Sequence, residues 1–522
     1  MKINISENKI LFVFLAAIGI CLCISAMSRG FIWDEAHHAN PALFLYNLVK
    51  DSPQDVLAYA TDYHAHYKFF SVLASYPPMN TILVSGAYTM LGPGIFVSRL
   101  VAIAESLIML FFVYKLSKFY SRGSKYMPFV CVLLAALHPV IFLFSSSNML
   151  DIGMTLFIVA GSYFFIKFLR TERRTYLFGL GIAMALGILC KLPMVLFFVP
   201  LILVMVLERK LHLFHSRSED FLRALIIFLV FVSPFLAQLW FLHSNGISGV
   251  FMAHWDRPSE SGILQSFLIT EPELVQSSLG VVFYQWFLAP FLLIGIVLLL
   301  RKRRDIDKLF LITAAFFFWF YTSNIISNIP DPRFVMPVVP FLVIISCHAL
   351  VSIGEWVGTR RLKLFVLGVF VVLASAQSAA YYSSIDYYDI PNLDRAAIFV
   401  IENAKEPTSV LTTWGQPQMF EFARLDSERK IYTMYLPKEL ENVAKAVRGD
   451  FSYYRSMEWW ERFGIEHPVP DYLILHEKIF REKVSYEYNL SHFEENPEFE
   501  LLGIIESDYE PNNRIFIYKI EH

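Results

Sequence analysis

Long apolar segments recur along most of the chain and are separated by short polar turns. About 20 consecutive apolar residues are needed to cross a bilayer as a helix, and about eleven segments approach that length. The pattern therefore predicts an α-helical polytopic membrane protein. The predicted spans are residues 10–27, 97–116, 127–145, 149–169, 176–190, 191–207, 221–242, 281–300, 309–328, 333–351 and 363–381.

One more apolar segment, from Pro77 to Pro93, has the length of a short span. Counting it as a span would reverse the side of every later loop, so a re-entrant or juxtamembrane, surface-lying helix is favoured. The segment then belongs to a long first external loop, residues 28–96. A second long external loop covers residues 243–280.

Lysine and arginine concentrate in alternate loops, which sets the orientation of the chain. The basic clusters lie within residues 115–125, 167–174, 209–223, 301–304 and 360–363. The positive-inside rule assigns each cluster to the cytoplasm. The intervening loops and the region after residue 385 are then outside, so residues 1–384 are predicted to form the transmembrane domain.

Composition supports this class and excludes others. Of the 522 residues, 56% are hydrophobic and 17% are charged, against roughly 25% charged in soluble domains. The net charge of −2 argues against a nucleic-acid partner, which requires a basic surface. The five cysteines lie in or beside apolar segments, which predicts neither a disulfide framework nor a thiolate metal site.

Residues 385–522 have a different pattern, with dense charge and short alternating runs. Helical patterns at 391–404 and 436–448 fall between the apolar runs, so we expect a soluble, extracytoplasmic α/β domain. The predicted strands are Ser409-Val410-Leu411-Thr412, Lys430-Ile431-Tyr432-Thr433-Met434, Asp471-Tyr472-Leu473-Ile474-Leu475 and Arg514-Ile515-Phe516-Ile517-Tyr518-Lys519-Ile520.

Two carboxylates and two imidazoles follow the first span, in the stretch from Asp34 and Glu35 to His37 and His38. Ionisable groups beside a bilayer are costly unless they are paired or hydrated, so they indicate function. Asp34 is a candidate general base for an acceptor hydroxyl, or a helix N-cap. Glu35 could orient Asp34, bind acceptor, ligate a metal, or be a solvated acid in the first helical turn.

The predicted topology places three more ionisable residues at external span ends. Asp151 is either a helix N-cap or a second acid of the same site. Lys191, among apolar residues, either binds a phosphate or extends to the interface. Arg333 either binds phosphate bidentately or pairs with Asp331.

External loops supply further candidates for binding. Arg257 is a candidate for donor phosphate, and Tyr76 and His254, with His37 and His38, are candidates for substrate. The imidazoles of His37, His38, His64 and His66 could also ligate a divalent metal such as zinc, but metal sites need ligands that converge in space. No cofactor is otherwise indicated.

Several motifs occur in an order that resembles the dolichyl-phosphate-mannose protein mannosyltransferase-like membrane glycosyltransferases, the C-type fold class that includes the lipid A aminoarabinose transferase. The motifs are Trp33-Asp34-Glu35-Ala36, Tyr76-Pro77-Pro78-Met79, Leu91-Gly92-Pro93, Ser98-Arg99-Leu100, Asn148-Met149-Leu150-Asp151, Cys190-Lys191-Leu192-Pro193 and Arg333-Phe334-Val335-Met336-Pro337-Val338-Val339-Pro340.

This resemblance covers roughly residues 10–345 and implies inverting transfer of a sugar from a polyprenyl-phosphate donor to a lipid, glycan or protein acceptor. It implies Asp34 as base, Lys191 and Arg333 near the lipid phosphate, and a bacterial inner-membrane protein with an extracytoplasmic site. Two departures leave donor, acceptor and metal dependence open. His37-His38 stands where relatives vary, and the usual Lys-Gly-Pro is Lys191-Leu192-Pro193.

Two other classes of protein compete with the glycosyltransferase. A transporter or flippase of a lipid-linked or anionic substrate would have acids near mid-span and an inverted repeat, whereas nearly all candidates found here lie at external span ends. A sensor or scaffold anchored by its membrane part would leave Lys191 and the paired acids unexplained.

Overall fold

The computed structural model divides into two compact units. The first comprises residues 1–28, 73–80 and 99–384, and the second comprises 29–72, 81–98 and 385–522. The second unit thus joins the C-terminal region to two segments of the first predicted external loop. The described residues are 7–27, 35–56, 58–60, 76–121, 124–244, 279–280, 285–302, 304–322, 332–356, 360–383, 393–403, 408–412, 431–435, 471–476, 493, 495–506 and 514–520.

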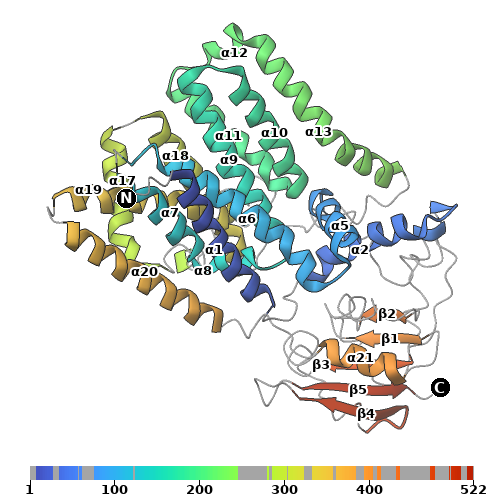
Figure 1. Ribbon diagram of the computed structural model, residues 1–522. Coiled ribbons are helices and arrows are strands. Elements are labelled where there is room, and N and C mark those ends of the chain that lie inside the picture. The colour runs from blue at the N-terminus through green and yellow to red at the C-terminus, as the bar shows by residue number, and fades with distance from the viewer. Residues whose placement is uncertain are drawn as a thin grey trace. The chain divides into compact units, whose positions relative to one another are not determined.

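Helices build the first unit (Figure 1). Within the described residues, each predicted span coincides with one helix or with two consecutive ones. The helices are α1 (Glu7–Met27), α6 (Ile95–Ser117), α7 (Met127–Ala136), α8 (Pro139–Ser145), α9 (Leu150–Thr171), α10 (Arg174–Cys190), η1 (Leu192–Phe197), α11 (Phe198–Leu207), α12 (His212–Ser216), α13 (Ser218–Ser244), η2 (Trp286–Leu288), α17 (Ala289–Lys302), α18 (Asp305–Thr322), η3 (Pro332–Val338), α19 (Val339–Trp356) and α20 (Arg360–Ser383).

Five helices in the described part of the chain are long and apolar enough to cross a membrane. A sixth span results if α7 and α8, which meet at 69°, are counted together. This bend has a local cause: His138 is extended (φ −68°, ψ 126°), as the ring of a following proline such as Pro139 favours. The total of about eleven spans stays a prediction, because several of the other apolar helices are shorter.

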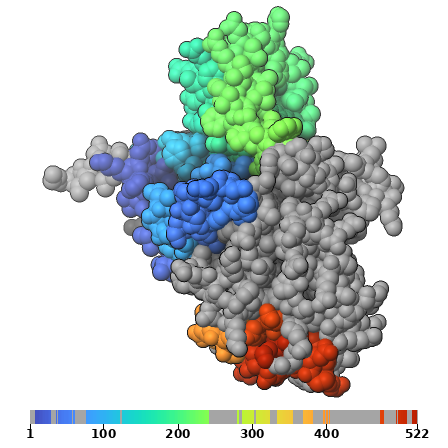
Figure 2. All heavy atoms as spheres, turned by 90° about the vertical axis from the view of Figure 1, so that its right-hand side faces the viewer, coloured from blue at the N-terminus to red at the C-terminus, as the bar shows by residue number. Residues whose placement is uncertain are grey.

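Apolar side chains on α13 point outward along its length. Leu222, Leu229 and Trp240 are 58%, 46% and 71% exposed, and the helix lies at the surface in Figure 2. A contiguous apolar face of this kind is unfavourable in water but is what lipid tails require. Together with the long apolar helices, it identifies an integral membrane protein.

An ion pair between the buried Asp307 and the partly exposed Arg304 lies at a helix end that the basic clusters assign to the cytoplasm. Asp307, at 1% exposure, accepts hydrogen bonds from Arg304 Nη2 at 3.0 Å and from Tyr120 Oη at 2.8 Å. The Arg304 guanidinium also lies over the Tyr120 ring, 4.9 Å from its centroid. These contacts join α18 to the chain just after α6.

The C-terminal part of the second unit contains a five-stranded sheet of order β2-β1-β3-β5-β4 with helix α21 (Leu393–Asn403). β1 pairs in parallel with β2 and β3, and β5 pairs antiparallel with β3 and β4. The strands are β1 (Thr408–Thr412), β2 (Ile431–Tyr435), β3 (Tyr472–His476), β4 (Phe499–Ile505) and β5 (Ile515–Ile520).

Four of these strands lie where the sequence predicts them, and α21 matches the helical pattern at 391–404. β4 was not predicted, and its pairing with β5 shifts register between Leu501 and Gly503. Such an irregularity interrupts the alternation by which strands are recognised. The predicted helix at 436–448 lies outside the described residues.

Candidate active site

Asp151 lies in the first turn of α9 rather than at its cap. The helix begins at Leu150, Met149 is the N-cap residue, and no side chain caps it. The N-cap alternative for Asp151 is therefore wrong. Its carboxylate is 1% exposed and faces the positive end of the helix dipole, which favours a negative charge.

Lys191 reaches this carboxylate from the end of α10. The helix stops at Cys190, and Lys191 is extended (φ −156°, ψ 128°) before η1 begins at Leu192. Its Nζ atom donates to Asp151 Oδ1 at 2.6 Å, with the two side chains 16% and 2% exposed. The ammonium group thus meets a buried acid instead of extending to the interface, the alternative considered from the sequence.

Arg333 lies close to Lys191 because both cations contact the aromatic ring of Phe334. The Lys191 Nζ atom lies 5.0 Å from the centroid of Phe334, and the Arg333 Cζ atom lies 5.4 Å from it. Arg333 Nη1 is also 3.7 Å from the Met149 sulfur. The structure therefore brings Asp151, Lys191 and Arg333 together, and we call them the Asp151–Lys191–Arg333 cluster. Asp331, the alternative partner of Arg333, lies outside the described residues.

Four stacked or tilted rings connect the two segments that carry these cations. Phe197 lies 6.4 Å from Phe317, Phe317 lies 6.0 Å from Tyr321, and Tyr321 lies 5.9 Å from Phe334 between ring centroids. The last pair is nearly parallel, with an interplanar angle of 10°. We call these rings the aromatic column. It links η1, which follows Lys191, through α18 to η3, which carries Arg333.

Hydrogen bonds fix the turn that precedes α9. Asn80 Nδ2 donates to Asn148 Oδ1 at 3.1 Å, and the Ser25 and Ser146 hydroxyls are 3.1 Å apart. The residues preceding α5 (Met79–Leu91) are tied elsewhere, since Gln238 Nε2 lies 3.5 Å from the Tyr76 carbonyl oxygen. The Asn80 and Ser25 contacts therefore hold the turn that leads into Met149 and Asp151, and the sequence did not reveal them.

Glu105 is a buried acid that was not among the candidates predicted from the sequence, nearly all of which lie at span ends. It lies in the middle of α6 and is 7% exposed. A Cβ atom at Gly153 would be 2.9 Å from Glu105 Oε1 and 2.9 Å from Cys190 Sγ. The missing side chain at Gly153 therefore lets α6, α9 and α10 meet closely beside the cluster.

In the second unit, Glu35 and His38 lie on α2 (Glu35–Asp51), at 0% and 5% exposure. The alternative of Glu35 as a solvated acid is therefore wrong. α2 packs on α5, where Tyr46 meets Tyr88 edge to face at 6.4 Å. His37 belongs to the same helix.

Five other candidate residues lie outside the described part of the chain: Asp34, His64, His66, His254 and Arg257. Within the described part of the chain, no group of three or more His, Cys, Asp or Glu side chains could hold a metal ion.

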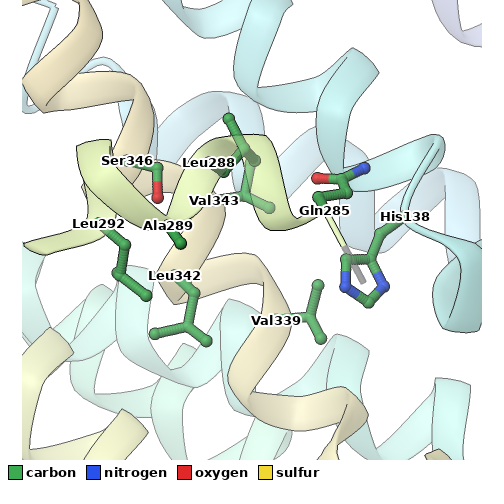
Figure 3. A pocket seen from close by; sticks show the side chains of 9 residues that line it. All are labelled: His138, Gln285, Leu288, Ala289, Leu292, Val339, Leu342, Val343 and Ser346. Atoms are coloured by element: carbon green, nitrogen blue, oxygen red, sulfur yellow. The ribbon is translucent and has the colours of Figure 1, made fainter. Parts of the chain in front are cut away.

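A cavity of about 20 Å³ lies where η2 and α17 meet α19 and the bend between α7 and α8 (Figure 3). Its lining is mostly apolar, with His138, Gln285 and Ser346 as polar groups. This volume holds about one water molecule. It shares no lining residue with the Asp151–Lys191–Arg333 cluster and is too small for a sugar.

The fold is similar to that of known membrane glycosyltransferases of the C-type class. Residues 75–238 match the family model described as dolichyl-phosphate-mannose-protein mannosyltransferase. The resemblance inferred from the sequence motifs is thereby confirmed. No curated protein matches the chain in sequence.

Solved structures with this fold include ArnT from Cupriavidus metallidurans in the apo state, with a TM-score of 0.65, 14% identity and 98% of each chain covered. The structure of ArnT from the same organism bound to undecaprenyl phosphate has a TM-score of 0.64 and 14% identity, with 97% of each chain covered. A third match is the archaeal oligosaccharyltransferase AglB from Archaeoglobus fulgidus, in complex with an inhibitory peptide and a dolichol-phosphate. Its TM-score is 0.55 and its identity 12%, and the match covers 99% of this chain and 75% of AglB.

Proposed function

We propose that the protein transfers a sugar from a polyprenyl-phosphate-linked donor to a lipid, glycan or protein acceptor on the extracytoplasmic face of the membrane. The observation that carries the proposal is the convergence of Lys191 and Arg333 on one ring beside the buried Asp151. Two fixed cations at helix ends suit a phosphate leaving group. The fold of ArnT, which has been solved with undecaprenyl phosphate bound, supports the same donor class.

In the proposed reaction, the acceptor oxygen attacks the anomeric carbon with inversion while the bond from that carbon to the phosphate oxygen breaks. Asp34 accepts the acceptor proton as general base, and Glu35 orients it. Lys191 and Arg333, with Arg257 as a further donor, stabilise the charge that develops on the polyprenyl phosphate. The proton then leaves Asp34 for solvent.

Purified protein supplied with a set of polyprenyl-phosphate sugars is expected to release polyprenyl phosphate as it glycosylates an acceptor. Parallel reactions with a chelator test dependence on a divalent metal through His37 and His38. Consumption of no donor, together with movement of a lipid across liposomes, would overturn the proposal and support the transporter alternative.

We also propose that residues 385–522 form an extracytoplasmic domain, with residues 1–384 in a bacterial inner membrane. The basic clusters at 301–304 and 360–363 both belong inside, with two spans between them. A reporter active only in the cytoplasm is therefore expected to be silent when fused after residue 385 and active when fused after residue 303. Activity of the fusion after residue 385 would contradict this topology.

A further inference from the structure

Phe334 contacts both cations of the Asp151–Lys191–Arg333 cluster. We propose that Phe334 is a positioning residue: its ring holds the Lys191 ammonium and the Arg333 guanidinium within reach of one phosphate. This role rests on the proposed function, because it assigns the two cations to a single lipid-linked phosphate.

Placing Lys191 and Arg333 close together requires something that offsets the repulsion between their charges. Two like charges repel, and the repulsion grows as the surroundings become less polar. A second carboxylate beside Lys191 would offset the repulsion, but it would also occupy N–H donors of the ammonium group that a phosphate needs. An aromatic face attracts cations through its quadrupole without accepting their hydrogen bonds.

The distances agree with a ring that attracts both cations without accepting hydrogen bonds from them. Lys191 Nζ and Arg333 Cζ lie 5.0 Å and 5.4 Å from the Phe334 centroid, within the roughly 6 Å range of cation–π attraction. Lys191 donates one hydrogen bond to Asp151, and an ammonium group has three donors. The cluster is thus held in place while Lys191 keeps donors for a phosphate.

The ring itself is fixed from α18. Tyr321 lies parallel to Phe334 at 5.9 Å, and the Tyr321 hydroxyl points to the Met154 sulfur at 4.0 Å. Met154 belongs to α9, the helix that carries Asp151. Phe334 is therefore supported by α18 and, through Tyr321, by the helix that carries Asp151.

The test compares Phe334→Leu with Phe334→Tyr in the intact, detergent-purified protein, with undecaprenyl phosphate as the probe. Leu fills much of the same space but has no quadrupole, whereas Tyr retains the ring. We expect Phe334→Leu to weaken binding about tenfold, because the two cations lose the ring that holds them in place. Phe334→Tyr is expected to bind within about twofold of the wild type.

Phe291→Leu is the matched control. Phe291 is also half-buried and packs on another ring, Phe370, at 5.2 Å, so it reports the general effect of losing a phenyl group. Fluorinated phenylalanines at position 334, which keep ring shape and weaken the quadrupole, should weaken binding in proportion to fluorination. The uncharged lipid undecaprenol should bind equally to the wild type and to Phe334→Leu.

Three results would overturn the role of Phe334. The first is equal binding of undecaprenyl phosphate by the wild type and Phe334→Leu. The second is an equal loss for undecaprenol, which would indicate packing alone. The third is a wild-type protein that binds undecaprenyl phosphate no better than undecaprenol. This third result would overturn the proposed function as well. The first two results would leave the proposed function intact.

Discussion

Replacing Asp34 by Asn is expected to lower sugar transfer by about 10²-fold or more, as for the loss of a general base. The amide keeps the shape and most polar contacts of the carboxylate but cannot accept the acceptor proton. Binding of the polyprenyl-phosphate donor should change little, because Lys191 and Arg333 remain. Turnover and donor binding are measured on the same purified variant, so that loss of chemistry is separated from loss of substrate.

Glu35→Gln is the matched control, because it makes the same change at the neighbouring acid. Its effect should be mild if Glu35 only orients Asp34, and severe and chelator-sensitive if Glu35 ligates a metal. Since Glu35 is fully buried, thermal stability must be followed in parallel. Full turnover by Asp34→Asn with an identified donor would place the base elsewhere, and Asp151 would be the next candidate.

Removing the Lys191 charge should have two separable effects. Lys191→Met leaves the Asp151 carboxylate buried without its counter-charge, and breaking a buried ion pair in this way costs about 3–5 kcal/mol. It also removes a charge-assisted contact to the donor phosphate, worth about 1.5–3 kcal/mol, or roughly a 10- to 100-fold weaker Kd. Thermal denaturation and titration with undecaprenyl phosphate measure the two effects.

The double variant Asp151→Asn/Lys191→Met separates a structural ion pair from a phosphate site. Without either charge, thermal stability should recover, because no uncompensated carboxylate remains. Donor binding should not recover. Arg333→Glu should likewise weaken donor binding more than it lowers protein abundance. Wild-type donor affinity in both the double variant and Arg333→Glu would exclude the phosphate role.

The apolar pattern was sufficient to locate the long apolar helices, because lipid demands long uninterrupted apolar runs. It was less informative where a helix breaks. Lys191 lies at such a break, and its sequence neighbours Cys190 and Leu192 give no sign of the Asp151 carboxylate 2.6 Å away. The partner comes from another helix, 40 positions earlier, and pairing across that separation depends on how α9 and α10 pack.

Phe334 and Glu105 were missed for different reasons. Among 49 phenylalanines, a ring that contacts two cations has no local signature, and only its position after Arg333 could have drawn attention to it. Glu105 was visible as an acid inside a predicted span, and such residues are functional hypotheses by default. The small neighbour that accommodates it, Gly153, is recognisable only once α6 and α9 are side by side.

The aromatic column also bears on the entropy of donor binding. Long cationic side chains lose about 0.5–1.5 kcal/mol each in rotamer freedom when a ligand immobilises them. In this protein Lys191 and Arg333 already rest on Phe334, and the column anchors their two segments to α18. Much of that ordering is completed during folding. Under the proposed function, the two cations are therefore preorganised for the lipid phosphate, and more of the interaction energy is retained as affinity.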